Sequence, residues 1–484
     1  MEDVPATTRK ASPAAAGAGR SATGNDHHDF LNIVIQQEGA GPPSTTTSTK
    51  EWLKYLMNGD HEGDAAAPEN VPCRTRIQRV PKMLREVKAN RKCFSPGVVS
   101  FGPFHSDKEL QVTEKTKMKW ARHFISRSST TNVDEFYASV EKTAKTTRHC
   151  YEHGSTDPFD DDAFSRMMFL DGCFILQFVD CCAGETGDDM NMKSHDVAFV
   201  TRDLFLLENQ IPFEVLKCLM ILRYGGFAEG MPILQKFIKQ RFQVEPMSHP
   251  VDPLHLLDLL RTNLLGTEGP PKVKLAVKGS RRSFRSASEL KSKGIHFRRS
   301  KTACLKDVNF KGNYLYGLLW LPAIVVDDST KSTFLNLIAY ETCPDAPDDS
   351  GVTSYIVFMD SLIDHARDVE ELRSRNILVN FLGSDEEVAT LFNEIATDLV
   401  PNMKTYDYVS SHIGTYYSQK WKSWTAQVLH DHFSSPWTAI AFLAGMLAIS
   451  LSVIQTYYTI SPSPDCTDTI CELIRNNTIK LSQS

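Results

Sequence analysis

An uncharged run near the C-terminal end constrains this chain more than any other feature. Residues 433–464 read FSSPWTAIAFLAGMLAISLSVIQTYYTISPSP, 32 residues without a charged side chain. A helix of roughly 20 apolar residues crosses the hydrocarbon core of a bilayer. Trp437 stands at one edge and Tyr457 and Tyr458 at the other, where amphipathic rings favour the headgroup level. The sequence predicts one transmembrane helix over residues 433–460, with a buried helix of a large soluble domain as the alternative interpretation.

The bulk composition sets the class of the remaining chain. Of 484 residues, 41% are hydrophobic and 10% are aromatic, which is ordinary for a globular protein. This balance excludes a wholly disordered chain and a chain with many membrane spans. Because a chain of this length is longer than one compact core usually supports, we expect residues 51–432 to form a helical domain with two lobes.

Residues 1–50 differ from that domain in composition. They are rich in Ala, Ser, Thr, Gly and Pro, and they bury too little apolar surface to offset the entropy of ordering. We therefore expect a disordered N-terminal arm. The same residues contain no apolar run of the kind that a secretory signal needs, so we expect the helical domain to be cytosolic.

Nine of the eleven cysteines precede the predicted span and fit that compartment. None belongs to a Cys-x-x-Cys pair, so we expect reduced thiols and neither a bound metal nor a cofactor. Residues 461–484 differ, because they hold Cys466, Cys471 and an N-glycosylation sequon that begins at Asn476. Disulfides form and asparagine glycans are attached in an oxidising, glycosylating compartment, so we expect this short tail to lie outside the cytosol.

Apolar periodicity predicts that the domain is mainly helical. Residues 167–179 are apolar nearly all round, which is typical of a core helix. Residues 204–224 have the same character, but Pro212 does not fit inside a helix, so we expect a break at Asn209 and Gln210 and a restart at Pro212. These two residues and Glu208 either line a pocket or satisfy the backbone groups of the helix ends, and we favour the second interpretation. Further helices are expected over residues 334–340, 355–373, 386–399 with Ser384 as its N-cap, and 406–432.

Short β-prone runs interrupt the helices between residues 295 and 326. Gly312, Gly317 and Pro322 separate these runs, as turn residues separate the strands of hairpins. We therefore expect a small antiparallel β-sheet. The predicted fold class is mainly α with this small sheet (α+β) and one C-terminal transmembrane helix.

One loop holds the residue that most resembles a catalytic group. Residues 93–105 contain two Gly and two Pro around an apolar run that ends at His105. A hydrolase that uses His105 needs a nucleophile within hydrogen-bond reach, and the spacing of residues places none. A structural histidine is therefore the preferred interpretation. A membrane-bound enzyme would instead gather His105, Asp171 and Glu208 around one concave pocket.

A basic segment at residues 272–301 contains eleven Lys or Arg and one acid, Glu289. It could be a solvated loop, a nucleic-acid patch or a segment on the anionic cytoplasmic leaflet. Because a span already holds the domain near a membrane, we rank lipid contact above nucleic acid. The candidate lipid contacts are Arg281, Arg282, Arg285, Arg298 and Arg299.

Small residues recur along the predicted span. Ala444, Ala448 and Ser452 are four residues apart, so they share one helix face. Such a face allows close approach of a second helix, which makes self-association through the span a hypothesis. The alternative is that these residues face lipid.

Several blocks of the sequence together resemble a plant protein family that is known as domain of unknown function 247. The blocks include RVPKMLR at 79, SPGVVSFGPFH at 95, MMFLDGCF at 167, DLFLLENQIPF at 203, SASELKSKGIHF at 286 and SPWTAIAF at 435. The resemblance runs from Arg79 to Thr456, which leaves out only the arm and the tail. Phe101 and Tyr340 stand where the family more often has Ile and Phe.

The resemblance implies a mostly helical, plant-specific membrane protein with no established enzymatic activity. Some members of the family resemble determinants of grass self-incompatibility, which implies signalling or recognition. It supplies no catalytic residues, in agreement with the absence of catalytic motifs from this sequence. We therefore expect a membrane-tethered interaction protein, not an enzyme, with an unknown protein partner. The alternative is a membrane-bound hydrolase that uses His105.

Overall fold

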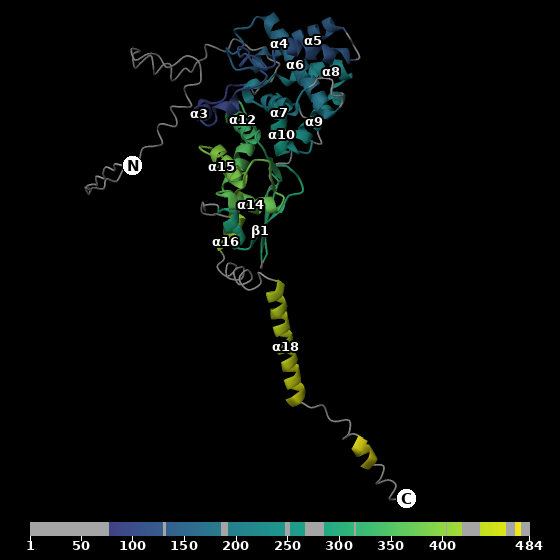
Figure 1. The fold of residues 1–484 in the computed structure, drawn as a ribbon, viewed down its shortest axis with the longest axis vertical. Helices are drawn as coiled ribbons and strands as arrows, with labels where there is room; N and C mark the ends of the chain where they lie inside the picture. Colours follow the sequence, from purple (N-terminus) through teal and green to yellow (C-terminus); the bar gives the residue numbers. More distant parts are fainter. Residues whose placement is uncertain are drawn as a thin grey trace, which may run out of the picture. The chain divides into compact units, whose positions relative to one another are not determined.

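The computed structural model describes residues 77–128, 132–184, 192–246, 252–266, 285–313, 316–402, 404–418, 436–460 and 470–475 (Figure 1). The chain divides into the units Met1–Pro72 and Cys73–Ser484, and every described residue belongs to the second unit. The predicted arm at residues 1–50 lies outside the described residues, as do Arg281, Arg282 and Asn476. The division of residues 51–432 into two lobes stays a prediction.

The described chain is mostly helical, as predicted. Its helices are α3 (Lys82–Arg85), α4 (Glu114–Ser126), α5 (Val133–Thr147), α6 (Asp161–Ala183), α7 (Ser194–Leu204), α8 (Phe213–Tyr224), α9 (Phe227–Phe242), α10 (Leu256–Leu265), α11 (Ala287–Ser292), α12 (Thr330–Thr342), α13 (Gly351–Asp360), α14 (Ala366–Ser374), α15 (Asp385–Ile395), α16 (Asp407–Ser418) and α18 (Pro436–Ile460). Short 3-10 helices are η2 (Arg91–Phe94), η3 (Arg148–Cys150) and η4 (Leu207–Asn209). The strands are β1 (Ile295–Arg299), β2 (Asn309–Gly312), β3 (Gly317–Leu321), β4 (Ile324–Val326) and β5 (Leu378–Asn380).

Helix α6 is the predicted core helix, and its neighbours α4, α5, α8 and α9 pack around it (Figure 1). It begins at Asp160, whose carboxylate accepts a hydrogen bond from the Ala163 N–H at 2.7 Å, and it ends at Gly184 in the left-handed conformation. Midway along the helix, a Cβ added at Gly172 would lie 2.5 Å from Leu219 of α8. The absence of a side chain at this glycine therefore lets α8 approach α6 closely.

The predicted break at Asn209 and Gln210 and the restart at Pro212 are confirmed, but the helix predicted to begin at residue 204 is wrong, because α7 ends there. Helix α7 ends at Leu204, η4 makes one short turn, and α8 begins directly after Pro212. Proline fits there because its fixed φ suits a helix start and its missing N–H is not needed by the first turn.

The small sheet is mixed, so the prediction of an antiparallel sheet is wrong for one strand. The strand order is β1-β3-β2, in which β3 runs antiparallel to β2 but parallel to β1. Strand β3 has the sequence GLLWL and buries Gly317, Leu319 and Leu321. The most apolar strand takes the centre because an edge would expose it. Strands β4 and β5 form a separate parallel pair.

The predicted helix at residues 355–373 is two helices, α13 and α14, so that prediction is wrong. Helix α13 ends at Asp360, and α14 begins after His365. His365 and Asp368 form a reciprocal capping box that starts the second helix. The predicted cap of α15 is confirmed, because the Ser384 hydroxyl accepts a hydrogen bond from the Glu387 N–H at 3.2 Å.

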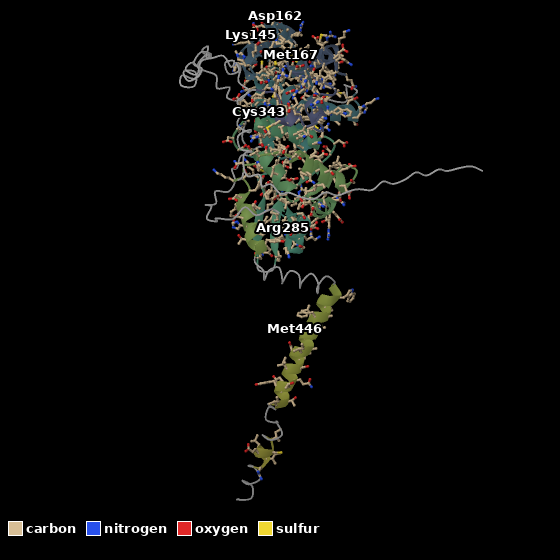
Figure 2. The ribbon with its side chains drawn as sticks, turned by 90° about the vertical axis from the view of Figure 1, so that its left-hand side faces the viewer. Lys145, Asp162, Met167, Arg285, Cys343 and Met446 are labelled. Atoms are coloured by element: carbon tan, nitrogen blue, oxygen red, sulfur yellow. The ribbon has the colours of Figure 1, made fainter. Side chains whose placement is uncertain are left out.

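The buried apolar side chains form one continuous cluster from Ile77 to Tyr416. Helix α16 joins this cluster next to β2, where the rings of Tyr416 and Phe310 lie 5.8 Å apart. The long helix predicted at residues 406–432 is described only as far as Ser418. Helix α18 contributes no side chain to the cluster, and its side chains stand out from the ribbon, Met446 among them (Figure 2).

Candidate functional site

The loop that ends at His105 is held by buried side chains that lie far along the chain. The Asp203 carboxylate is fully buried and accepts hydrogen bonds from three successive backbone N–H groups. The donors are Gly97 at 3.0 Å, Val98 at 2.7 Å and Val99 at 3.1 Å. Since ionised acceptors make strong hydrogen bonds, one aspartate fixes the path of the loop.

The two amides at the helix break complete this arrangement. The Asn209 side chain accepts from the Phe101 N–H at 2.7 Å and donates to the Val99 carbonyl at 3.1 Å. The Gln210 side chain donates to the carbonyls of Leu204 and Leu206, both at 2.8 Å. The interpretation that these residues satisfy backbone groups is confirmed.

Asn336 of α12 adds a third segment to the same region. Its side-chain oxygen accepts from the Leu207 N–H at 2.8 Å, and its side-chain nitrogen donates to the Cys93 carbonyl at 2.8 Å. Asn336 is fully buried. The loop, the helix break and α12 therefore meet at one amide side chain.

His105 contacts a buried acid. Its Nε2 lies 3.2 Å from the carboxylate of Glu208, which also accepts from the Val80 N–H at 2.8 Å and from the Arg85 guanidinium. Burial alone would raise the pKa of Glu208, but the hydrogen bonds from His105, Arg85 and Val80 lower the pKa below its ordinary value. Glu208 is thus an ionised link between the loop and the segment around α3.

Asp171 of α6 supports the loop from the other side. It is buried, accepts from the Gly102 N–H at 2.9 Å and pairs with the Lys117 ammonium. Burial raises the pKa of Asp171, while the charge and hydrogen bond of Lys117 oppose this rise. Lys117 also donates to the Ser100 carbonyl, so the ion pair holds the loop against α4 and α6.

A cavity of about 680 Å³ lies beside this ion pair. Asp171, Lys117, Ser100 and Ser106 are among its lining residues, but His105 and Glu208 are not. The pocket that a hydrolase would need, with His105, Asp171 and Glu208 together, is therefore not formed by this cavity. His105 faces Glu208 instead.

The structure separates the candidate lipid contacts that it describes. Arg285 pairs with Glu289 at 2.5 Å and lies over the Tyr417 ring at 4.9 Å. Arg298 and Arg299 line a different place, a cleft of about 480 Å³ at β1. Arg375, from the end of α14, lines the same cleft and was not predicted from the sequence.

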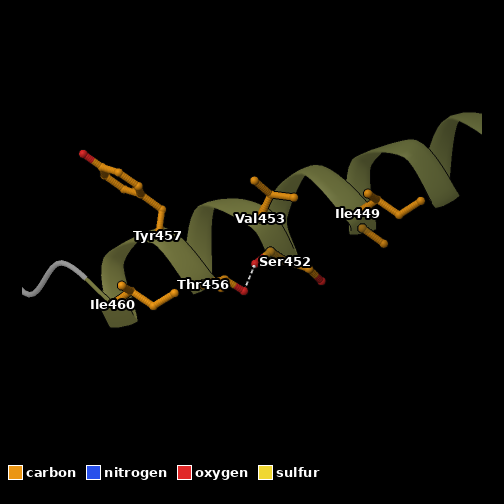
Figure 3. A pocket seen from close by; sticks show the side chains of 7 residues that line it. Ile449, Ser452, Val453, Thr456, Tyr457 and Ile460 are labelled. Atoms are coloured by element: carbon orange, nitrogen blue, oxygen red, sulfur yellow. Dashed lines mark hydrogen bonds between the residues drawn. The ribbon is translucent and has the colours of Figure 1, made fainter.

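Helix α18 carries the residues predicted to span a membrane. Its part Ile440–Ile460 is long and apolar enough to cross a bilayer, and none of it is buried. Trp437, Tyr457 and Tyr458 are exposed near its two ends, as the aromatic pattern predicts. Ala448 and Ser452 line a hollow of about 610 Å³ on one side of the helix, next to Thr456 and Tyr457, whereas Ala444 does not line it (Figure 3).

The thiols and acids offer no metal site within the part of the chain that the structure describes. The described cysteines form no disulfide, and burial raises the pKa of Cys173 far above its ordinary value. Cys173 is therefore a protonated, buried thiol, which suits a packing role.

The fold and these sites define a class of protein. The described residues are mostly helical, the buried polar side chains form hydrogen bonds to the backbone of the loop and the helix break, and one apolar helix, α18, is fully exposed. The chain matches the family described as "Plant protein of unknown function" (DUF247) over residues 77–451, and it belongs to this family. The resemblance drawn from the sequence blocks is thus confirmed.

Two curated proteins of Arabidopsis thaliana are similar to this chain along most of their length. UPF0481 protein At3g47200 is 29% identical over 441 residues, which cover 83% of this chain and 90% of that protein. Putative UPF0481 protein At3g02645 is 22% identical over 490 residues, which cover 79% and 89%. No solved structure matches this chain.

Proposed function

We propose that this protein is a single-pass, membrane-anchored plant interaction protein that acts by binding and not by catalysis. The observation that carries the proposal is α18, a helix of 25 residues without a charged side chain and without a buried residue in Ile440–Ile460. Water is an unfavourable environment for an uncovered apolar surface of this length, whereas a bilayer covers it completely. A membrane anchor therefore accounts for the helix.

The proposed topology places the folded residues in the cytosol and residues 461–484 on the other side of the membrane. The buried Cys173 and Cys343, which form no disulfide, support this, since disulfides are rare in the cytosol. The sequon at Asn476 supports the opposite location of the tail.

The preference for binding over catalysis rests on His105. His105 is 6% exposed, its ring contacts Glu208, and it does not line the neighbouring cavity. A general base must reach the proton that it removes, and a histidine in this position reaches a structural carboxylate instead. We propose a protein partner for the folded part, lipid as a second partner, and a recognition role like the one that the family resemblance implies.

Membrane extraction tests the anchor directly. Ala444→Arg places a charge near the middle of α18, which costs about 2.5–3.5 kcal/mol on insertion scales. We expect the wild-type chain to stay in the membrane pellet after carbonate washing and the Arg variant to shift to the supernatant. Ala444→Leu is the matched control and should stay in the pellet. Glycosidase treatment of that pellet should lower the apparent mass of the wild type but not of Asn476→Gln. Release of the wild-type chain by carbonate would contradict the proposal.

A further inference from the structure

The cleft at β1 gathers cationic side chains from two distant segments. His296, Arg298 and Arg299 come from β1, and Arg375 comes from the residue after α14. The Tyr316 ring lies 6.2 Å from the His296 ring and closes one side. The strand pairing places His296 opposite Leu318 on β3, so the lining of the cleft contains an apolar side chain beside the basic ones.

The positive charge of this cleft is only partly balanced. Glu371 lies 3.6 Å from the Arg375 guanidinium and also pairs with Lys291. Among the residues that the structure describes, Arg298 and Arg299 form no ion pair, whereas Arg373 pairs with Asp385 at 2.9 Å. Guanidinium groups around a concave surface match the geometry of phosphate oxygens.

The chain connection keeps this cleft near the anchor. The sheet that contains β1 packs through β2 against α16, where Tyr416 covers Gly312. Helix α16 ends at Ser418, and only residues 419–435 separate it from α18. A linker of this length reaches at most about 60 Å when fully extended. The end of α16, which packs on the sheet, therefore lies within about 60 Å of the helix that we propose lies in the membrane.

We infer that the cleft binds the phosphorylated headgroup of an anionic membrane lipid, with Arg298, which shares the exposed face of β1 with His296, and Arg375 as the phosphate ligands. This inference rests on the proposed anchor, which brings the cleft to a lipid surface. A cleft of defined size should bind a lipid whose phosphomonoester enters it more tightly than phosphatidylserine. This preference should hold when the two lipids carry the same total charge. That selectivity distinguishes it from a diffuse polybasic surface.

His296 should make this binding depend on pH. The groups that face it are Lys291, Arg298, Tyr316, Glu371 and Arg375. Burial and the charge of Arg375 lower the pKa of His296, so the empty cleft favours the neutral ring at neutral pH. A bound phosphate favours the charged ring. The ring should therefore take up a proton on binding. Because the phosphomonoester itself gains a proton near pH 6, the expected result is that the wild-type chain loses less affinity than a His296→Gln variant as the pH falls from 7.5 to 5.5.

The test uses the full-length chain in neutral detergent micelles and a fluorescent short-chain phosphatidylinositol 4-phosphate, with anisotropy as the readout. Arg298→Gln and Arg375→Gln should each weaken binding about fivefold, since one basic residue near an anionic headgroup contributes about 1 kcal/mol. Arg367→Gln, exposed on α14 and outside the cleft, is the matched control and should leave the affinity unchanged. His296→Gln should lose more affinity than the wild type between pH 7.5 and pH 5.5, and equal losses in the two would contradict the role of His296.

Three results would overturn the inference. The first is an unchanged affinity of the Arg298→Gln variant, whose folded state loses no ion pair of its own. The second is equal binding of phosphatidylserine at the same total charge, and the third is equal binding of soluble inositol 1,4-bisphosphate, which would indicate a free phosphate compound and not a lipid. Because binding in micelles does not require a spanning helix, carbonate release of the wild-type chain would refute the anchor without changing this measurement.

Discussion

His255 offers a sharp test of the folded part, because a buried neutral imidazole begins a core helix. Its Nδ1 accepts a hydrogen bond from the Asp258 N–H at 3.1 Å at the start of α10, so the neutral ring carries its proton on Nε2. The ring is fully buried and meets the Tyr340 ring edge-on at 4.9 Å. Burial lowers the pKa of His255 from 6.5 to about 4, although the Asp258 charge opposes this shift. Protonation would also place an N–H on Nδ1, facing the Asp258 N–H whose hydrogen bond the neutral ring accepts.

The size and sign of the effect follow from these two pKa values. The unfolded chain binds this proton at a pH near 6.5, whereas the folded chain resists it until about pH 4. The stability from the neutral ring is therefore complete above about pH 6.5 and is lost as the pH falls through that value. Between pH 7.5 and pH 5, the free energy of unfolding should fall by about 2 kcal/mol from this residue alone.

His255→Asn separates this proton from every other titration. Asparagine is a good N-cap but does not titrate, so the variant should lose about 2 kcal/mol less than the wild type between pH 7.5 and pH 5. The measurement is denaturant unfolding of the full-length chain in detergent at both pH values, followed by tryptophan fluorescence. His255→Ser is a second non-titrating cap in case the asparagine variant folds poorly. Equal losses in the wild type and in both variants would refute the reasoning.

Two further predictions concern the loop and the span. Asp203→Ala should lower the free energy of unfolding by roughly 3 kcal/mol or more, because it leaves three backbone N–H groups without their charged acceptor. Asp134→Ala, at an exposed position, is the control. An equally small loss of stability in both variants would contradict the role of Asp203. Ala448→Ile should weaken self-association of the chain in membranes by filling the hollow on α18, while Leu447→Ile, which changes shape outside that hollow, should not. An in-membrane association assay that gives the same result for both variants would indicate that this face of α18 contacts only lipid.

Local signals in the sequence were enough to place the helix boundaries that depend on single residues. Pro212 marked the break before α8, and Ser384 marked the start of α15. The division between α13 and α14 was missed because the N-cap is His365, a residue that patterns do not associate with helix starts. Sheet direction was missed for another reason: the order of β1, β2 and β3 depends on which strand is buried in the middle, and spacing does not contain that information.

The sites illustrate the same limit. Arg298 and Arg299 were predicted from the local excess of basic residues, but Arg375 lies in another segment and reaches the cleft only through the fold. His105 and Glu208 were grouped from the sequence only as part of a hydrolase pocket with Asp171, whereas in the structure Glu208 contacts His105 away from the cavity that Asp171 lines. The structural role that the sequence favoured for His105 was not assigned a partner, because spacing alone does not show which acid a buried histidine contacts.

The amide of Asn336 has a consequence for how the chain is made. It donates to the Cys93 carbonyl across 243 positions of sequence, so the loop lacks this partner until α12 has been synthesised. At about 5–20 residues per second, the delay on the ribosome is roughly 12–50 s. During that interval η2, which holds the buried Phe94, lacks the surface of α12 against which it packs. The nascent chain should therefore engage chaperones until translation passes Asn336, and a transcript truncated before that codon should yield only material destined for proteolysis.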